Sequence, residues 1–81
     1  ELMLIKVATR TELVRAEIKR NVDIFRAQIV DVNTNNYTIQ VTGTSDKLDA
    51  FAKTLGQSAE IIEASRTGVF GLARGDRALR P

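Results

Sequence analysis

The stretch from residue 27 to residue 51, AQIVDVNTNNYTIQVTGTSDKLDAF, is the part of this chain that decides its fold. Residues 28–32 are predicted to form a strand. Residues 33–36 follow as a turn, because asparagine tolerates positive φ and hydrogen-bonds to its own backbone. Apolar residues then alternate with polar ones, as in a strand buried on one side: Tyr37, Ile39 and Val41. The stretch therefore predicts two strands joined by a tight turn.

A helix is expected directly after this pair of strands. Gly43 ends the second strand, and Thr44 or Ser45 caps the helix. Its apolar stripe recurs at helical spacing and consists of Leu48, Phe51, Ala52 and Leu55. Gly56 is placed to end this helix, and residues 59–64 (AEIIEA) predict a last strand.

The residues before the paired strands predict one more strand. Residues 2–7 (LMLIKV) are apolar at both odd-numbered and even-numbered positions, except for Lys6. One side of this strand carries Met3, Ile5 and Val7, and the other carries Leu2 and Leu4. A strand that is apolar on both sides is expected to be covered on both sides, or nearly so.

A first helix is predicted between this strand and residue 27. Thr9 and Glu12 match the T-x-x-E capping box, and the helix is expected to run to about Phe25. The apolar stripe is Val14, Ile18, Val22 and Phe25, flanked by Leu13 and Ile24. The opposite side carries Arg15, Lys19 and Arg26 beside Glu12 and Asp23. Such a mixture favours a solvated helix face, and a docking surface is the alternative.

The resulting order of elements is βαββαβ, which is typical of an α+β, ferredoxin-like fold. We expect a four-stranded antiparallel sheet with two helices on one face, built from residues 1–67. Residues 68–81 (GVFGLARGDRALRP) are too rich in glycine for a strand and too apolar for simple disorder. We expect them to form an arm of the same domain that docks on the open sheet face or on a neighbour. The chain begins at Glu1 inside a strand pattern, so we also expect it to be part of a longer protein.

Composition argues against an autonomous enzyme. The 81 residues include no histidine and no cysteine, which removes the usual general base, disulfides and thiolate metal ligands. We predict no catalytic, cofactor-binding or metal-binding residue. The net charge is +2 and aromatic residues make up 5% of the chain, so a nucleic-acid interface is disfavoured. No apolar run approaches the length of a membrane span, and no signal peptide is visible.

Four blocks of the sequence carry a resemblance to a known family. They are ELMLIKV (1–7), EIKRNVDIFRAQIVDV (17–32), TGTSDKLDAF (42–51) and ASRTGVFGLARGD (64–76). In this order and spacing they resemble the C-terminal half of the small, regulatory subunit of acetolactate synthase (acetohydroxyacid synthase). The resemblance covers essentially the whole chain, although each block alone would be weak.

The resemblance implies an ACT-like domain that follows an N-terminal ACT domain in the same subunit. It implies a homodimer of regulatory subunits and a large catalytic subunit that holds thiamine diphosphate, Mg²⁺ and FAD. It further implies activation of that subunit and feedback inhibition by valine or other branched-chain amino acids. The implied location is the bacterial cytoplasm, or a plastid or mitochondrion in a eukaryote.

The family's effector site is associated mainly with its ACT domain, so no effector-binding residue is carried over to this chain. The connection at residues 8–11 (ATRT) lacks the glycine that lets backbone approach an amino-acid ligand, which argues against an intact site. Instead, we predict a partner interface made of Leu2, Leu4, Val69, Phe70, Arg74 and Arg77. The alternatives are a free-standing ACT-like sensor of small molecules and, less favoured, an RNA-binding module. Tyr37 is the only aromatic of the central strands, and its parity places it in the core.

Overall fold

The elements of the fold follow the predicted order. The computed structural model describes residues 1–67, and the predictions made for residues 68–81 lie outside that description. The elements are β1 (Leu2–Ala8), α1 (Glu12–Ile24), β2 (Gln28–Val32), β3 (Asn36–Thr42), α2 (Ser45–Ser58) and β4 (Ile61–Arg66). The predicted βαββαβ order is therefore confirmed.

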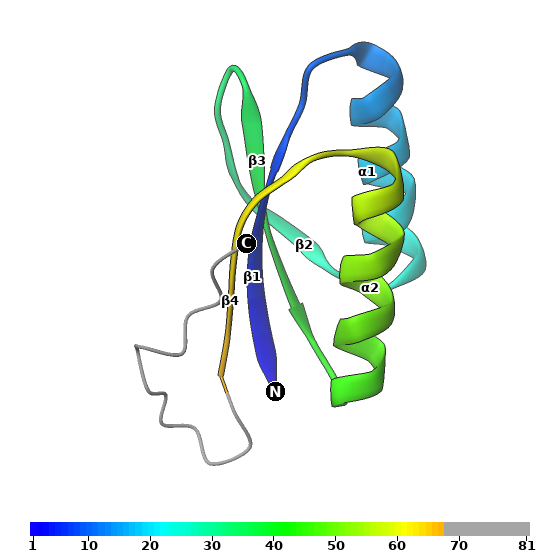
Figure 1. The fold of residues 1–81 in the computed structure, drawn as a ribbon, viewed down its shortest axis with the longest axis vertical. Helices are drawn as coiled ribbons and strands as arrows, with labels where there is room; N and C mark the ends of the chain where they lie inside the picture. The colour runs from blue at the N-terminus through cyan, green and yellow to red at the C-terminus, as the bar shows by residue number, and fades with distance from the viewer. Residues whose placement is uncertain (68–81) are drawn as a thin grey trace.

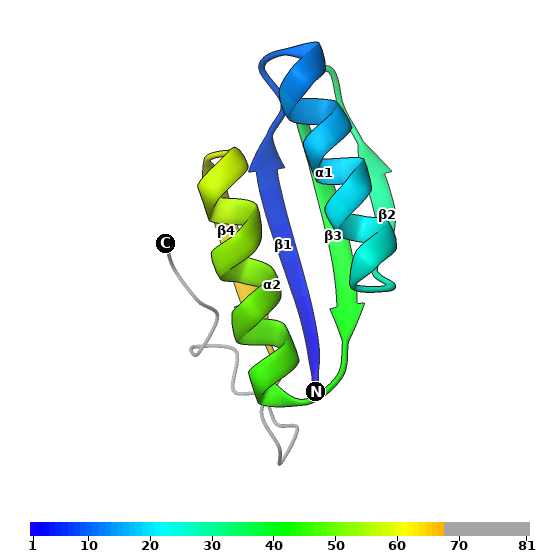
Figure 2. The same cartoon turned by 90° about the vertical axis from the view of Figure 1, so that its right-hand side faces the viewer.

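The strands form one sheet in the order β2-β3-β1-β4, and each neighbouring pair is antiparallel. Both helices lie on the same side of this sheet, and its other side carries no helix within residues 1–67 (Figure 1). Figure 2 shows α2 in front of β4 and α1 in front of β3 and β2, with β1 visible between the two helices. This is the ferredoxin-like arrangement that the sequence predicts.

The core fills the space between the sheet and the two helices. The side chains of β1 alternate as predicted, because Met3, Ile5 and Val7 are at most 1% exposed whereas Leu4 is 37% exposed. The other members of the core cluster come from α1, β3 and α2: Ile18, Val22, Tyr37, Ile39, Val41, Leu48, Phe51 and Leu55. Phe25 packs edge-on against Phe51, with ring centroids 5.1 Å apart. The helix stripes predicted from periodicity thus form the core.

The predicted start of α1 is wrong by two residues. Thr11 is the N-cap, and its Oγ1 accepts a hydrogen bond from the Val14 amide at 3.1 Å. Thr9 is instead buried at 3% exposure, and its hydroxyl has no partner within the described residues. Threonine can cap a helix at either position. Because β1 ends at Ala8 and α1 begins only at Glu12, Thr9 lies too far before the helix to cap it.

The end of α1 uses a residue in the left-handed region. Arg26 has φ 57°, and its amide donates to the Asp23 carbonyl at 3.3 Å. The Ala27 amide donates to the Val22 carbonyl at 2.8 Å, which completes a Schellman motif. Glycine usually occupies this position, so the sequence gives no obvious stop signal here.

The predicted stop of α2 at Gly56 is also wrong. The helix continues to Ser58, and the Ala59 amide donates to the Leu55 carbonyl at 2.9 Å. Thr44 is its N-cap, which is one of the two residues predicted for this position. Because α2 is longer, β4 starts at Ile61 and ends at Arg66, two residues later than predicted at each end.

Candidate interaction surface

The side of the sheet opposite the helices is the first candidate site. We call it the open face, defined by Leu2, Leu4 and Lys6 of β1 with their cross-strand partners on β3 and β4: Thr38, Gln40, Thr42, Glu63 and Ser65. Leu4 stands between Gln40 and Ser65 in the ladder. The next row carries an ion pair, with Lys6 Nζ 3.8 Å from Glu63 Oε1. An apolar side chain surrounded by polar residues is typical of a protein–protein interface. A small-molecule site, by contrast, is usually concave.

Both edges of the sheet carry a bulge with an exposed apolar residue. Val30 is the extra residue between the rungs of Ile29 and Asp31 on β2, and it is 49% exposed. Ile62 is the extra residue on β4 and is 40% exposed. Bulges at edge strands interrupt the ladder and hinder uncontrolled pairing with another sheet. These two positions could not be predicted from the sequence, because a bulge depends on the pairing of two strands.

The beginning of β1 is tied to the last described residue. The Leu2 amide donates to Thr67 Oγ1 at 2.9 Å, and the Thr67 amide donates to the Leu2 carbonyl at 2.9 Å. Thr67 therefore lies beside Leu2, at one end of the open face. The other predicted interface residues, Val69, Phe70, Arg74 and Arg77, lie outside the described residues. The role of all six residues at an interface stays a prediction.

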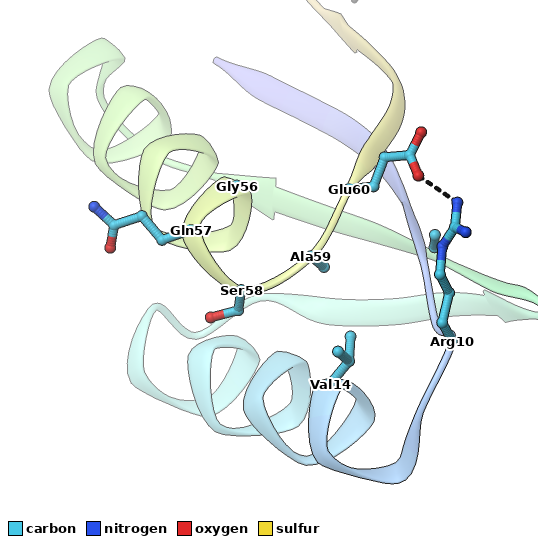
Figure 3. Close-up of a pocket in the computed structure, with 8 residues that line it drawn as sticks. Arg10, Val14, Gly56, Gln57, Ser58, Ala59 and Glu60 are labelled. Atoms are coloured by element: carbon cyan, nitrogen blue, oxygen red, sulfur yellow. Dashed lines mark hydrogen bonds and ion pairs between the residues drawn. The ribbon is translucent and has the colours of Figure 1, made fainter.

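A groove of about 410 Å³ lies at the opposite end of the domain (Figure 3). It is lined by Ala8, Arg10, Val14, Gly56, Gln57, Ser58, Ala59 and Glu60. Val14 of α1 points toward the loop that carries Ala59, and an ion pair between Arg10 and Glu60 closes one side (Figure 3). The side chains of this pair are 69% and 61% exposed, so solvent screens it strongly. No functional residue was predicted here, because the groove forms only when the end of α2 meets the start of α1.

Backbone donors beside the groove are already engaged. The Ala8 amide donates to the Glu60 carbonyl at 2.9 Å, and the Thr9 amide donates to the Asn35 carbonyl at 2.9 Å. The Thr9 carbonyl accepts from the Arg15 guanidinium at 3.1 Å. An amino-acid ligand can be held through its carboxylate by unpaired backbone amides. The groove therefore offers little to such a ligand at Ala8 and Thr9.

Residues 1–67 contain neither a candidate metal site nor a candidate membrane span. No group of three or more acidic side chains is placed to hold a metal ion there. No helix in this part of the chain is long and apolar enough to cross a membrane. The aromatic rings described are Phe25, Tyr37 and Phe51, and all three pack in or against the core between sheet and helices. They are not available for stacking on RNA bases at the open face.

These features define a small α+β module whose most distinctive surface is suited to contact with another protein. Comparison with known proteins places it in a family. Residues 1–75 match the model of a family described as "Small subunit of acetolactate synthase". The chain belongs to this family.

Curated relatives agree with that assignment. The chain is 51% identical to the acetolactate synthase isozyme 3 small subunit of Salmonella typhimurium over 80 residues, which are 99% of this chain and 48% of the relative. It is 49% identical to the Escherichia coli protein of the same name over 80 residues, again 99% of this chain and 48% of the relative. A probable acetolactate synthase small subunit of Methanothermobacter thermautotrophicus is 42% identical over 79 residues, or 98% of this chain and 46% of the relative. The chain spans about half the length of the curated relatives it matches.

Proposed function

We propose that this chain is a non-catalytic domain of a regulatory subunit and that it binds the catalytic subunit of acetolactate synthase. Membership of the small-subunit family supports a large-subunit partner. The single structural observation that carries the proposal is the open face, where Leu4 is 37% exposed on a central strand. An exposed apolar surface with a polar rim marks a candidate contact with another protein.

The proposed contact combines the open face with the arm of residues 68–81. Thr67, the residue that precedes the arm, is hydrogen-bonded to Leu2 in both directions. Val69 and Phe70 would supply apolar anchors, and Arg74 and Arg77 would pair with carboxylates of the partner. In this proposal thiamine diphosphate, Mg²⁺ and FAD reside on the catalytic subunit, and none of them is held by this domain.

Regulation by a branched-chain amino acid is the second part of the proposal. Valine or a related effector would bind elsewhere in the subunit, and this domain would transmit its effect to the catalytic subunit. The engaged amides of Ala8 and Thr9 support a site outside this domain. The homodimer of regulatory subunits belongs to the same proposal.

The competing function is a free-standing sensor of small molecules, and the groove beside Arg10 and Val14 favours it. Equilibrium dialysis of the chain against valine, leucine and isoleucine separates the two. Our proposal predicts no saturable binding to this chain. Binding that is lost in Val14→Trp, which would fill the groove, would favour the sensor.

Co-purification tests the proposed partner. A tagged form of the chain is mixed with the catalytic subunit of acetolactate synthase and recovered on an affinity resin. We expect the catalytic subunit to be retained by the parent chain and lost with Leu4→Lys. Ala50→Lys adds the same charge on the exposed side of α2 and is the matched control, which we expect to bind like the parent. Equal recovery with Leu4→Lys and the parent would exclude the open face as the contact.

A further inference from the structure

The two bulges of the sheet lie in the same row of the ladder. On β2, two consecutive residues stand opposite Thr38 of β3. On β4, two consecutive residues stand opposite Lys6 of β1. Thr38 and Lys6 are themselves cross-strand partners, so the row runs across all four strands. We call the six residues of this row the bulge row: Val30, Asp31, Thr38, Lys6, Ile62 and Glu63.

The bulge row lies on the open face of the sheet. Successive side chains of a strand point to opposite sides. Ile29 and Ile61 each pair with a residue that is 0% exposed, so both point toward the helices. Val30 and Ile62 come directly after them and therefore point away from the helices. A regular strand would turn the next residue back toward the core, whereas each bulge keeps it on the open face.

Each bulge thus presents an apolar residue and a carboxylate next to each other on the open face. Val30 is 49% exposed and Ile62 is 40% exposed. The side chain of Glu63 is 65% exposed, and Asp31 is exposed as well. Because β2 and β4 are the two edges of the sheet, three strand spacings separate the carboxylates, or about 14 Å. Leu4 stands between these edges, one row away on the same face.

The charges of the bulge row are unbalanced. Among the paired positions of the open face, Asp31, Lys6 and Glu63 carry charge, and all three belong to this row. Lys6 Nζ lies 3.8 Å from Glu63 Oε1, so two carboxylates share one ammonium group. Protein partners match such a pattern with charges of the opposite sign. The row is therefore complementary to a surface that is basic at two points and apolar between them.

From this pattern we propose that the bulge row selects the partner of the open face, and that the matching surface of the catalytic subunit is apolar and basic. The inference rests on the proposed function, because it takes the catalytic subunit as the partner. An apolar group of the partner lies over Leu4, and lysine or arginine side chains lie opposite Asp31 and Glu63. The bulges serve this contact, since they bring two consecutive side chains to one face, which a regular strand cannot do.

Two valines of β2 give a matched test of the apolar part. Val30→Ser changes the bulge row, whereas Val32→Ser makes the same change on the helix side of the same strand, because Val32 pairs with the buried Tyr37. Val32 is 61% exposed, so neither substitution opens the core. In calorimetric titration of the full chain into the catalytic subunit, we expect Val30→Ser to bind about tenfold more weakly and Val32→Ser to bind like the parent.

Charge reversal tests the acidic part independently. Asp31→Lys and Glu63→Lys are each expected to weaken binding about tenfold, and together about a hundredfold, because sites this far apart act additively. Asp23→Lys makes the same change in net charge on the exposed side of α1 and is expected to bind like the parent. Raising the salt from about 50 mM to about 500 mM should weaken the parent and narrow its advantage over the reversed variants. Circular dichroism and the melting temperature separate lost binding from lost folding.

The possible failures of this inference and of the proposed function give different results. Absence of binding by the parent would overturn both. Binding that is lost with Leu4→Lys but kept with Asp31→Lys and Glu63→Lys would overturn the role of the bulge row alone, as would equal affinities of the two valine variants. A charge effect that vanishes in a chain without residues 68–81 would also overturn it, because the arm of the same chain would then be the basic partner of the row.

Discussion

Replacing Phe51 by alanine tests the core of this fold most severely. Phe51 is 0% exposed, and its ring packs edge-on against Phe25 at a centroid distance of 5.1 Å. Truncation of a buried phenylalanine costs about 3–5 kcal/mol, which includes about 0.5–1.5 kcal/mol for the lost ring pair. The total stability of a domain of this size is about 4–12 kcal/mol. We therefore expect Phe51→Ala to remove most of the stability.

Thermal unfolding followed by circular dichroism measures this effect. Each kcal/mol shifts the melting temperature of a domain this small by about 4–8 °C, so Phe51→Ala should lower it by about 12–40 °C. Phe51→Leu is the matched control, because it keeps most of the volume and should cost less than about 1.5 kcal/mol. A Phe51→Ala variant that melts within about 3 °C of the parent would refute the packing described for α2.

Three other changes test separate parts of the structure. Gly56→Ala should stabilise the chain by about 0.5–1 kcal/mol in urea unfolding, because Gly56 lies inside α2 and an added Cβ would meet Ile61 Cδ1 at an ordinary 3.5 Å. A loss of stability would contradict the placement of Gly56 inside the helix. Thr11→Ala should cost about 1 kcal/mol through the lost cap, whereas Thr9→Val should be neutral or stabilising because it removes an unpartnered hydroxyl; the reverse order would support the cap predicted from sequence. Deletion of residues 68–81 should leave the circular dichroism spectrum near that of the parent while weakening binding to the catalytic subunit, and unchanged binding would remove the arm from the proposed interface.

Patterns of apolar residues predicted most of the fold, because burial follows a period of two in strands and of 3.6 in helices. The stripe with Phe51 and the alternation of Met3 with Leu4 are both as expected. Stop and start signals were less reliable. Gly56 lies inside α2, although glycine has a low helix propensity, and Arg26 adopts the left-handed conformation that follows α1, although glycine is usual there. In both places backbone hydrogen bonds to the adjacent helical turn outweigh the intrinsic preference of a single residue.

The candidate surfaces were predictable only in part. Leu4 follows from the parity of a central strand, so its exposure could be anticipated from the sequence. Val30 and Ile62 could not be found in this way, because each is exposed at a bulge that depends on how two strands pair.

A binding isotherm between this chain and the catalytic subunit of acetolactate synthase tests the central claim most directly. The chain is titrated into the catalytic subunit, with heat of binding and rate of acetolactate formation recorded together. We predict saturable binding by the parent and by Ala50→Lys, and binding at least tenfold weaker with folded Leu4→Lys. Absence of binding by the parent, or equal affinity for all three chains, would contradict the account.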